Sequence, residues 1–419
     1  MRVYPSKMHG SVTIPPSKSV AHRAIIAAAL SRGKSEISNI DLSSDIKATI
    51  RACEALGCEI SIVHGEPYHT VIVNGGIHIN DIAKIDCCES GSTMRFLIPI
   101  ACAISGTKVF SGSGLLPIRP IDAYFEIFEQ DGIVYKKPAE ANLPLTVQGT
   151  LKGGDYVIDG SVSSQYITGL LFALPMLDVD STITIVNKFE SKGYVDITLS
   201  VLEQFGIEIV CAKEKFSIRG NQQYKPQNMS VEGDFSQAAF FLTGGCISGD
   251  ICVRGLSEKS LQPDKAIVDI LRRMGGNIEY TTEGLGARKS ALRGIEVDVS
   301  QCPDIVPPIA VAAALAKGET QITGAARLRI KESDRLESVS TNLNNLGIET
   351  SVFSDGITIE GGVFSGGCID SFNDHRITMA FSMAALCASD IVDISGEDSI
   401  NKSYPKFFED YVSVGGKIS

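Results

Sequence analysis

Lysine, arginine and serine residues recur at the start of apolar segments in this 419-residue chain. The segment SKSVAHRAIIAAAL begins at Ser17, and SGSTMRFLIPIACA begins at Ser90. If these segments are helices, their first N–H groups are unpaired and carry partial positive charge. Cationic and hydroxyl side chains at such ends favour binding of phosphate or carboxylate groups. The residues at these ends are Lys18, Ser19, Arg23, Gly91, Ser92, Arg95, Ser163, Ser164 and Gln165.

The second half of the chain has ionisable residues at matching positions and in further loops. The chain as a whole is acidic, with 38 Lys and Arg against 49 Asp and Glu. An anionic ligand would therefore need a local basic site, which these residues can supply. They are Asp304, then Asp374 with His375 and Arg376, and in loops Arg119, Ser191 with Lys192, Lys331 with Glu332 and Arg335, and Lys402.

Each of these residues also has an ordinary structural explanation. Charged residues in a first turn can be solvated, serines commonly cap helices, and charges four residues apart can form surface ion pairs. These explanations apply to Lys18 and Arg23, to Ser163 and Ser164, to Arg335 beside Asp334 and Glu337, and to His375 as a structural histidine.

The elements that position these residues form a repeat. A pattern of about 70 residues contains an apolar helix, a short strand, a charged loop, an amphipathic helix and a strand. It occurs six times, and we expect the apolar helices to be buried because they are apolar on nearly all sides. They begin at Ser17, Ser90, Ser163, Gly233, Pro303 and Asn373, and the second halves begin at Gly33, Gly106, Asp180, Gly249, Gly318 and Ser389.

A glycine follows each amphipathic segment, as expected for a helix C-terminal cap. The six repeats predict an α/β protein with two similar lobes of three repeats each. We expect residues 15–232 to form one lobe, and residues 1–14 with 233–419 to form the other, so that the N-terminal strand returns to the second lobe. Since both lobes supply cations, we expect a pair of ligands between them. The capping glycines are Gly57, Gly132, Gly206, Gly275, Gly347 and Gly415.

Composition excludes several classes of protein. A chain of 419 residues with 44% hydrophobic residues is typical of a globular protein with two domains. The net charge of -11 argues against a general nucleic-acid or membrane-surface binder. The N-terminal MRVYPSKMHGS has no signal-peptide pattern, and the apolar run at 96–104 is too short to span a bilayer. We therefore expect a cytoplasmic protein whose 11 cysteines are reduced and mostly buried.

Taken together, seven strings resemble the 5-enolpyruvylshikimate-3-phosphate synthases, and they extend from the first repeat to the sixth. Their order and spacing are specific to that family. They are PPSKSVAHR (15–23), SGSTMR (90–95), GSVSSQ (160–165), ESKGYVDITL (190–199), RIKESDRL (329–336), FNDHR (372–376) and INKSYP (400–405).

The resemblance implies two lobes of three βαβαββ units, an inside-out α/β barrel called the enolpyruvyl transferase fold, with the active site in the cleft. It implies addition of the shikimate 5-hydroxyl to phosphoenolpyruvate and loss of phosphate, without metal or cofactor, in a monomer. Shikimate 3-phosphate would contact Lys18, Ser19, Arg23, Ser163, Ser164, Gln165, Ser191, Tyr194, Asp304 and Lys331. Phosphoenolpyruvate would contact Lys18, Gly91, Arg119, Gln165, Arg335, Arg376 and Lys402.

This reaction requires one proton to leave the hydroxyl and another to reach C3, so a pair of carboxylates in a desolvated site is expected. Our hypothesis is that Asp304 is the base on the hydroxyl and Glu332 is the acid toward C3. Lys18 would stabilise charge on the phosphate, and Lys331, His375 or both would tune the carboxylates.

The chain departs from the family pattern in a few places. Leu115 and Leu116 occupy a stretch where an additional Arg is common, so that Arg119 would act alone there. Arg327 replaces a common Asn and puts one shikimate contact in doubt. Ser92 and Phe96 stand where Thr and Pro are common.

Three other functions are compatible with parts of the pattern. The related UDP-N-acetylglucosamine enolpyruvyl transferases have Lys-Asn where this chain has Lys18-Ser19, and a Cys in a loop where residues 111–119 have none. A non-catalytic anion-binding relative would not need Asp304 and Glu332. A nucleic-acid end-processing enzyme is disfavoured by the acidic charge and the absence of a GxxxxGK[ST] loop.

Overall fold

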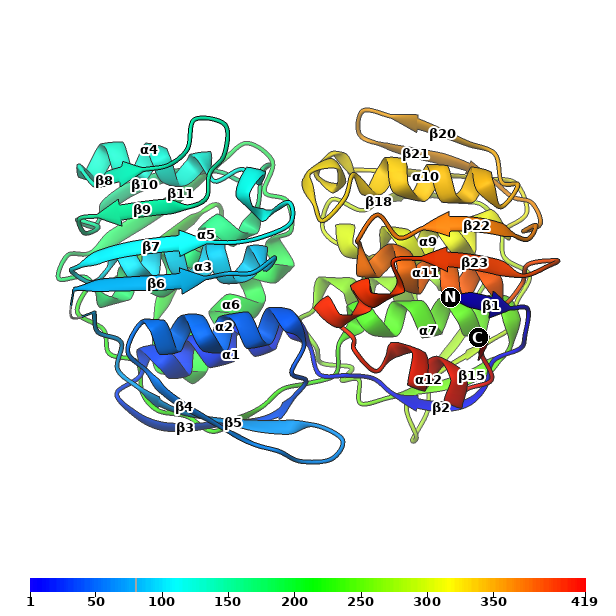
Figure 1. The fold of residues 1–419 in the computed structure, drawn as a ribbon, viewed down its shortest axis with the longest axis horizontal. Helices are drawn as coiled ribbons and strands as arrows, with labels where there is room; N and C mark the ends of the chain where they lie inside the picture. Colours follow the sequence, from blue (N-terminus) through cyan, green and yellow to red (C-terminus); the bar gives the residue numbers. More distant parts are fainter. Residues whose placement is uncertain (80) are drawn as a thin grey trace. The chain divides into compact units, whose positions relative to one another are not determined.

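The computed structural model describes residues 1–79 and 81–419 and divides the chain into two compact units. The middle unit is Lys18–Val231, and the terminal unit combines Met1–Ser17 with Glu232–Ser419. The divisions therefore follow Ser17 and Val231, where the sequence analysis places them after residues 14 and 232. In Figure 1 the terminal unit therefore contains the dark blue N-terminal strands together with the green to red part of the chain.

The middle unit contains alternating helices and short strands. Its helices are α1 (Lys18–Leu30), α2 (Ser44–Ala55), α3 (Gly91–Cys102), α4 (Asp122–Asp131), α5 (Ser164–Ala173) and α6 (Lys192–Gln204). Its strands are β3 (Gly33–Ile40), β4 (Glu59–Val63), β5 (His69–Gly75), β6 (Ile82–Asp86), β7 (Thr107–Ser111), β8 (Val134–Lys136), β9 (Leu145–Gln148), β10 (Gly154–Asp159), β11 (Ser181–Val186), β12 (Ile209–Ala212), β13 (Lys215–Ile218) and β14 (Met229–Ser230).

The terminal unit repeats this alternation. Its helices are α7 (Phe235–Ser248), α8 (Ala266–Arg273), α9 (Val306–Ala314), α10 (Arg335–Asn345), α11 (His375–Ala385) and α12 (Phe407–Ser413). Its strands are β1 (Arg2–Tyr4), β2 (His9–Thr13), β15 (Asp250–Arg254), β16 (Asn277–Tyr280), β17 (Leu285–Arg288), β18 (Glu296–Asp298), β19 (Glu319–Thr323), β20 (Thr350–Phe353), β21 (Gly356–Glu360), β22 (Gly367–Asp370), β23 (Val392–Ser395) and β24 (Lys417–Ile418).

The predicted repeat is confirmed in the sheet topology. In the second repeat β6 is parallel to β7, β7 is antiparallel to β9, and β9 is antiparallel to β8. Because α3 lies between the parallel strands and α4 follows β7, the chain order is βαβαββ. The same order of strands gives three separate four-stranded sheets in the described part of each unit.

Three repeats borrow a strand from a distant part of the chain. The strand β14 comes from the end of the middle unit and pairs in parallel with β3 of the first repeat. In the terminal unit, β2 pairs in parallel with β15, and β1 lies between β23 and β24. The N-terminal strands therefore complete the fourth and sixth repeats, and each unit is finished by a segment remote in sequence.

Each amphipathic helix ends in the same hydrogen-bonded turn. At the end of α2, Gly57 donates its N–H to Glu54, and Cys58 donates to Cys53. This pair of bonds is the Schellman cap, which requires a left-handed residue that glycine adopts without steric cost. The cap recurs at all six predicted glycines, whose φ angles range from 71° to 100°: Gly57, Gly132, Gly206, Gly275, Gly347 and Gly415.

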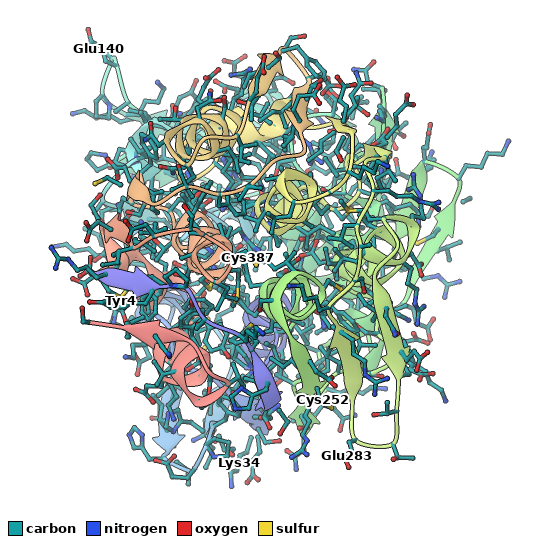
Figure 2. All side chains as sticks on the ribbon, turned by 90° about the vertical axis from the view of Figure 1, so that its right-hand side faces the viewer. Tyr4, Lys34, Glu140, Cys252, Glu283 and Cys387 are labelled. Atoms are coloured by element: carbon teal, nitrogen blue, oxygen red, sulfur yellow. The ribbon has the colours of Figure 1, made fainter. Side chains whose placement is uncertain are left out.

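Each unit has its own hydrophobic core, built around its three apolar helices. Figure 2 looks at the terminal unit nearly along α7, α9 and α11, with the strands toward the outside, Glu283 at the tip of the β16–β17 hairpin and Cys387 near α11. The apolar helices are buried, as predicted. All 11 cysteines are free, and six of them are buried, which confirms the predicted mostly buried thiols.

Candidate functional site

In the middle unit, the first turn of α1 carries Lys18. Its Nζ lies 2.7 Å from Oδ2 of Asp45 in the first turn of α2, and both side chains are less than one-fifth exposed. Lys18 is therefore held between two helix ends rather than fully solvated. The sequence analysis did not single out Asp45, although its place at the start of an amphipathic helix gave a weak signal.

Arg23 lies one turn and a half further along α1 and is buried. It donates to the hydroxyl of Thr198 at 2.8 Å and to the carbonyls of Ser19 and Tyr194 at 2.6 and 3.0 Å. Its guanidinium lies 4.9 Å from the ring centroid of Phe96. Burial lowers the pKa of Arg23 to about 9, so this arginine stays charged at neutral pH. The alternative that Arg23 is a solvated first-turn residue is wrong.

The starts of α3 and α5 are joined through Gln165. Its Oε1 accepts a hydrogen bond from Arg95 at 2.7 Å, and its Nε2 donates to the hydroxyl of Ser92 at 3.0 Å. A Cβ added to Gly91 would lie 2.9 Å from Nη1 of Arg119 and 3.3 Å from Nη1 of Arg95. A side chain at this position would push Arg119 aside, so glycine lets two guanidinium groups lie close to the helix start, where they favour anion binding.

The two serines before Gln165 have different roles. Ser163 caps α5 by accepting a hydrogen bond from the N–H of Gln165 at 3.3 Å, so the capping explanation is confirmed for this residue. Ser164 is buried in the first turn. Ser191 precedes α6 with a left-handed backbone, φ 53°, which is uncommon outside glycine and occurs often at functional positions.

Arg119 follows a short 3-10 helix at Leu116–Ile118. Leu116 is buried and anchors this turn, whereas Leu115 is exposed. The carbonyl of Arg119 accepts a hydrogen bond from Asn142 at 2.9 Å, and the side chain of Arg119 is buried. The loop therefore places Arg119 beside Gly91, where Arg95 of α3 also lies.

Hydrogen bonds link the first two turns of these helices in a closed ring within the middle unit. Most of its links are made by hydroxyl and amide groups, and Arg23 has no carboxylate partner among these links. Its links are Lys18–Asp45 (α1 to α2), Thr49–Thr93 (α2 to α3), Ser92–Gln165 (α3 to α5), Thr168–Thr198 (α5 to α6) and Thr198–Arg23 (α6 to α1).

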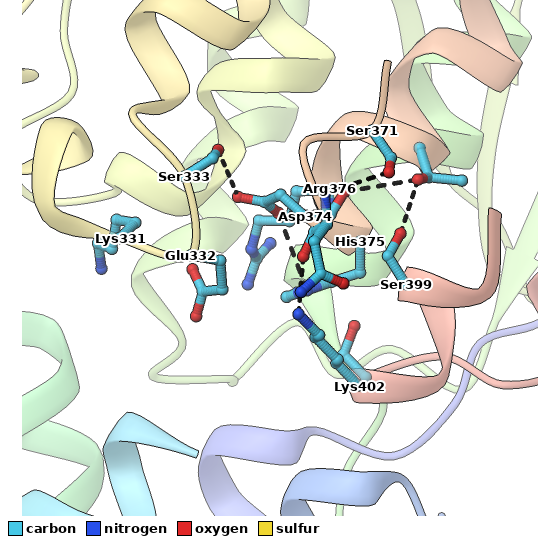
Figure 3. A network of polar contacts seen from close by, with 12 residues as sticks. Lys331, Glu332, Ser333, Ser371, Asp374, His375, Arg376, Ser399 and Lys402 are labelled. Carbon is cyan, nitrogen blue, oxygen red and sulfur yellow. Dashed lines mark hydrogen bonds and ion pairs between the residues drawn. The ribbon is translucent and has the colours of Figure 1, made fainter. Parts of the chain in front are cut away.

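In the terminal unit, Arg335 connects three carboxylates at the start of α10. Its guanidinium lies 2.9 Å from Asp304, 2.6 Å from Glu332 and 2.7 Å from Asp374. The side chain is 2% exposed, and its carboxylate partners raise the pKa of Arg335 even though burial lowers it. Figure 3 shows that Glu332 and Asp374 come from two different segments of the chain. The alternative that Arg335 forms a surface ion-pair face is wrong, because Arg329 makes those pairs with Asp334 and Glu337.

Three cations form ion pairs with Asp304. Arg376 lies 3.1 Å from its Oδ2, and Lys331 lies 3.5 Å from its Oδ1. Burial alone would raise the pKa of Asp304, but Arg376, Lys331 and Arg335 together hold it well below its usual range. Burial lowers the pKa of Lys331, while Asp304 opposes that change. Asp304 is therefore ionised at neutral pH.

Asp374 is fully buried and holds the start of α11 in place. Its Oδ1 accepts the N–H of Arg376 at 2.9 Å, and its Oδ2 accepts the hydroxyl of Ser333 at 3.2 Å. His375 is buried beside it, and Lys402 donates to the carbonyl of Asn373 at 2.7 Å. Figure 3 shows Lys402 below His375, on the segment that follows Ser399.

The sequence-predicted residues thus form two groups, one at the helix ends of each unit. Lys192, named as a loop cation, is instead exposed and pairs with Asp196 on its own helix at 2.8 Å. Arg327 donates to the carbonyl of Ser300 at 2.8 Å. Within residues 1–79 and 81–419, none of the helices has the length and hydropathy required to cross a membrane.

Comparison with known proteins identifies the family. A family model described as EPSP synthase (3-phosphoshikimate 1-carboxyvinyltransferase) matches residues 3–411. The 3-phosphoshikimate 1-carboxyvinyltransferase of Clostridium acetobutylicum is 47% identical over 420 residues, covering 100% of this chain and 98% of that protein. The enzyme of the same name from Clostridium novyi is 46% identical over 428 residues, covering 100% and 98%.

A solved structure gives the same result. The EPSP synthase of Acinetobacter baumannii superposes with a TM-score of 0.83 at 28% identity, covering 100% of this chain and 99% of that one. Sequence and structure agree over the full length, including every segment that carries the charged groups above. The chain therefore belongs to the EPSP synthase (3-phosphoshikimate 1-carboxyvinyltransferase) family.

Proposed function

We propose that the chain uses the charged groups of its two units to transfer the enolpyruvyl group of phosphoenolpyruvate to the 5-hydroxyl of shikimate 3-phosphate. The products are 5-enolpyruvylshikimate 3-phosphate and phosphate, and the reaction belongs to the shikimate pathway of aromatic amino-acid synthesis. The full-length family match supports this activity. The relatives' names favour shikimate 3-phosphate over UDP-N-acetylglucosamine as the acceptor.

The observation that carries the chemical proposal is the contact of one buried arginine with Asp304 and Glu332, at 2.9 and 2.6 Å. This contact brings together two carboxylates that are 28 residues apart in the sequence. A pair of carboxylates can serve the two proton transfers, one from the hydroxyl and one to C3. We assign Asp304 as the base and Glu332 as the acid.

Substrate charge would make Asp304 a better base. In the described structure its pKa is well below the usual range because Arg376, Lys331 and Arg335 surround it. A carboxylate with such a low pKa is ionised but accepts protons weakly. Phosphate and carboxylate groups bound to these cations would offset their charge, and the pKa of Asp304 would rise toward the range useful for general base catalysis.

The binding roles follow the resemblance position by position. Gly91, Arg119, Gln165, Arg335, Arg376 and Lys402 would bind phosphoenolpyruvate, and Ser19, Arg23, Ser163, Ser164, Gln165, Ser191, Tyr194, Asp304 and Lys331 would bind shikimate 3-phosphate. Lys18 would contact both. Arginine forks support this assignment because they bind phosphate and carboxylate groups in a bidentate manner. His375 and Lys331 would tune the carboxylates. We further propose that the protein acts in the cytoplasm as a monomer.

The test is release of inorganic phosphate from phosphoenolpyruvate by the purified chain, with shikimate 3-phosphate or UDP-N-acetylglucosamine as acceptor. Release with shikimate 3-phosphate alone is expected, and release with the nucleotide sugar alone would contradict the proposal. The acid and base roles are tested by exchange of deuterium into C3. We expect Glu332→Gln to lose this exchange, whereas loss in Asp304→Asn but not in Glu332→Gln would refute the assignment.

A further inference from the structure

A buried histidine lies between the two cations of α1. The side chain of His22 is 1% exposed, one turn after Lys18 and next to Arg23. Its Nδ1 lies 2.6 Å from the hydroxyl oxygen of Thr49 on α2. Within the described residues its Nε2 is buried without a hydrogen-bond partner, and the ring meets Phe96 edge to face, with centroids 6.5 Å apart. The roles assigned above do not include this residue.

The position of the proton on His22 follows from a chain of hydroxyl groups. Thr93 donates its hydroxyl proton to Ser90 at 2.7 Å. A hydroxyl has one proton, so Thr93 must accept in its contact with Thr49, at 2.7 Å. Thr49 therefore donates its hydroxyl proton to Thr93 and must accept a hydrogen bond from Nδ1 of His22. The donors therefore run in one direction, from His22 through Thr49 and Thr93 to Ser90.

This direction defines one state of the imidazole ring. The proton lies on Nδ1, and Nε2 carries a lone pair that is buried without a hydrogen-bond partner among the described residues. Burial, together with the charges of Lys18 and Arg23, lowers the pKa of His22 well below its usual value. The ring is therefore neutral at neutral pH and serves as a hydrogen-bond donor of fixed direction.

The hydroxyl chain joins the segments that carry the proposed phosphoenolpyruvate contacts. Lys18–Asp45 and His22–Thr49 connect α1 and α2 one turn apart, and each pair is separated by 27 residues. At the other end of the chain, Ser90 is the N-cap of α3 and accepts the N–H of Thr93 at 3.2 Å. Gly91, the residue beside Arg119, follows directly.

We propose that His22 is a positioning residue, which as the neutral Nδ1–H tautomer fixes the start of α1 relative to the start of α3 and so holds Lys18 and Gly91 where phosphoenolpyruvate binds. This inference rests on the proposed function, because it concerns the same substrate. His22 acts through Thr49 and Thr93 and touches neither substrate nor reacting atoms.

Three variants of the full chain test the inference. His22→Leu removes the donor while keeping an apolar side chain, His22→Asn restores an N–H donor near the position of Nδ1, and Thr49→Val interrupts the chain. We expect kcat/KM for phosphoenolpyruvate to fall about 10- to 100-fold in His22→Leu and Thr49→Val, because small displacements of binding groups have effects of this size. His22→Asn should recover most of the loss. Thr243→Val, which removes a buried hydroxyl donating to Pro308 in the terminal unit at 3.4 Å, is the matched control and should retain activity.

Nitrogen NMR of histidine-labelled protein tests the tautomer without any reaction. At about pH 7.5 the His22 ring should show one protonated nitrogen at Nδ1 and one bare nitrogen at Nε2, and Thr49→Val should alter this signature. A proton on Nε2, a doubly protonated ring, or equal kcat/KM in His22→Leu and wild type would overturn the inference.

Failure of the proposed function would be distinguishable from failure of this inference. If the wild-type chain releases no phosphate, the function fails, and calorimetric binding of phosphoenolpyruvate to wild type and the three variants replaces kinetics. Equal binding by wild type and His22→Leu would then refute the positioning role, whereas weakened binding restored in His22→Asn would support it.

Discussion

The two units hold the starts of their helices together with different chemical groups. In the middle unit, hydroxyl and amide groups make most of the links between neighbouring helices near their starts, as in Thr168–Thr198 and Ser92–Gln165. In the terminal unit, ion pairs centred on Arg335 link the segments at the starts of α9, α10 and α11. Arg23 donates to carbonyls and a hydroxyl, so its positive charge is available to a phosphate. Arg335 instead pairs with three carboxylates, two of which are the groups proposed to transfer protons.

This difference indicates a division of labour. The neutral partners of Arg23 leave its positive charge for an anion, whereas the terminal unit places Asp304 and Glu332 on one arginine, as two proton transfers require. The same repeat supplies both because the helix ends are equivalent in the fold and their side chains are not. The following experiments test this contrast, from the largest expected effect to the smallest.

Arg335→Met should have the largest effect, because it leaves three carboxylates in a buried site without their common partner. Removing one partner of a buried charge network costs about 3–5 kcal/mol, and activity should be lost. Urea unfolding followed by circular dichroism measures the first effect, and phosphate release measures the second. Arg329→Met is the control, since its partly exposed pairs with Asp334 and Glu337 are worth about 0–1 kcal/mol. Equal losses in both variants would contradict the contrast.

Gly91→Ala tests the proposed anion site at the start of α3 in the middle unit. The added Cβ would lie 2.9 Å from Nη1 of Arg119, so the arginine must move away from the space beside the helix start. We expect KM for phosphoenolpyruvate to rise about 10- to 100-fold, with the free energy of unfolding changed by less than about 1 kcal/mol. Steady-state kinetics with each substrate varied is the measurement. Gly286→Ala, where the nearest atom to the added Cβ lies 3.6 Å away, should leave both values unchanged.

The two units should also respond to pH in different ranges. His22 has a lowered pKa in the folded chain, so below its unfolded value of about 6.5 the unfolded state binds more protons. Stability is then lost as the pH falls from about 6.5 toward the folded pKa, by up to about 1.4 kcal/mol per pH unit. Chemical denaturation at several pH values should show a shallower loss in His22→Asn than in wild type.

The contribution of Asp304 to stability should change in a more acidic pH range, because its pKa is lowered from an already acidic value. Its contribution is present above the unfolded pKa of about 3.9 and is lost as the pH falls through the folded pKa. If the free energy of unfolding falls equally with pH in wild type and His22→Asn between about pH 6.5 and 5, the loss in that range does not come from His22 of the middle unit.

Thr320→Val should have the smallest effect. The hydroxyl of Thr320 on β19 is fully buried and has no hydrogen-bond partner among the described residues. An isosteric methyl removes its desolvation penalty, so we expect a gain of up to about 1 kcal/mol. Thr168→Val, which removes a hydroxyl bonded to Thr198 at 2.9 Å, should instead lose about 1–3 kcal/mol. Differential scanning calorimetry distinguishes the two signs.

Much of the fold could be predicted because its signals are local. Glycine after each amphipathic helix predicts a cap, and the six caps at Gly57 and its equivalents are confirmed. The apolar helices are buried, as their composition indicates. The exchange of β14 into the first repeat was less visible, since a strand of two residues has almost no sequence pattern.

The site was predicted less completely, for physical reasons. Lys18, Gly91 and Asp304 stand at helix starts, where position alone indicates a role. Asp45 also stands at a helix start, but this weak signal did not reveal its partner, because Lys18 lies on another helix and the fold brings the two within 2.7 Å. Lys192 looked equivalent to Lys331 in sequence, yet an acidic residue four positions later pairs with it at the surface.

The sequence by itself determined the repeat, the caps, the buried helices and the family, because each depends on residue type and spacing along the chain. Only the tertiary structure decided which partners these residues have: that Arg335 joins Asp304, Glu332 and Asp374, and that His22 starts a directed chain of hydroxyls. Hydrogen bonds and ion pairs act over a few ångströms in space, and the chain brings such groups together from segments that its order does not reveal.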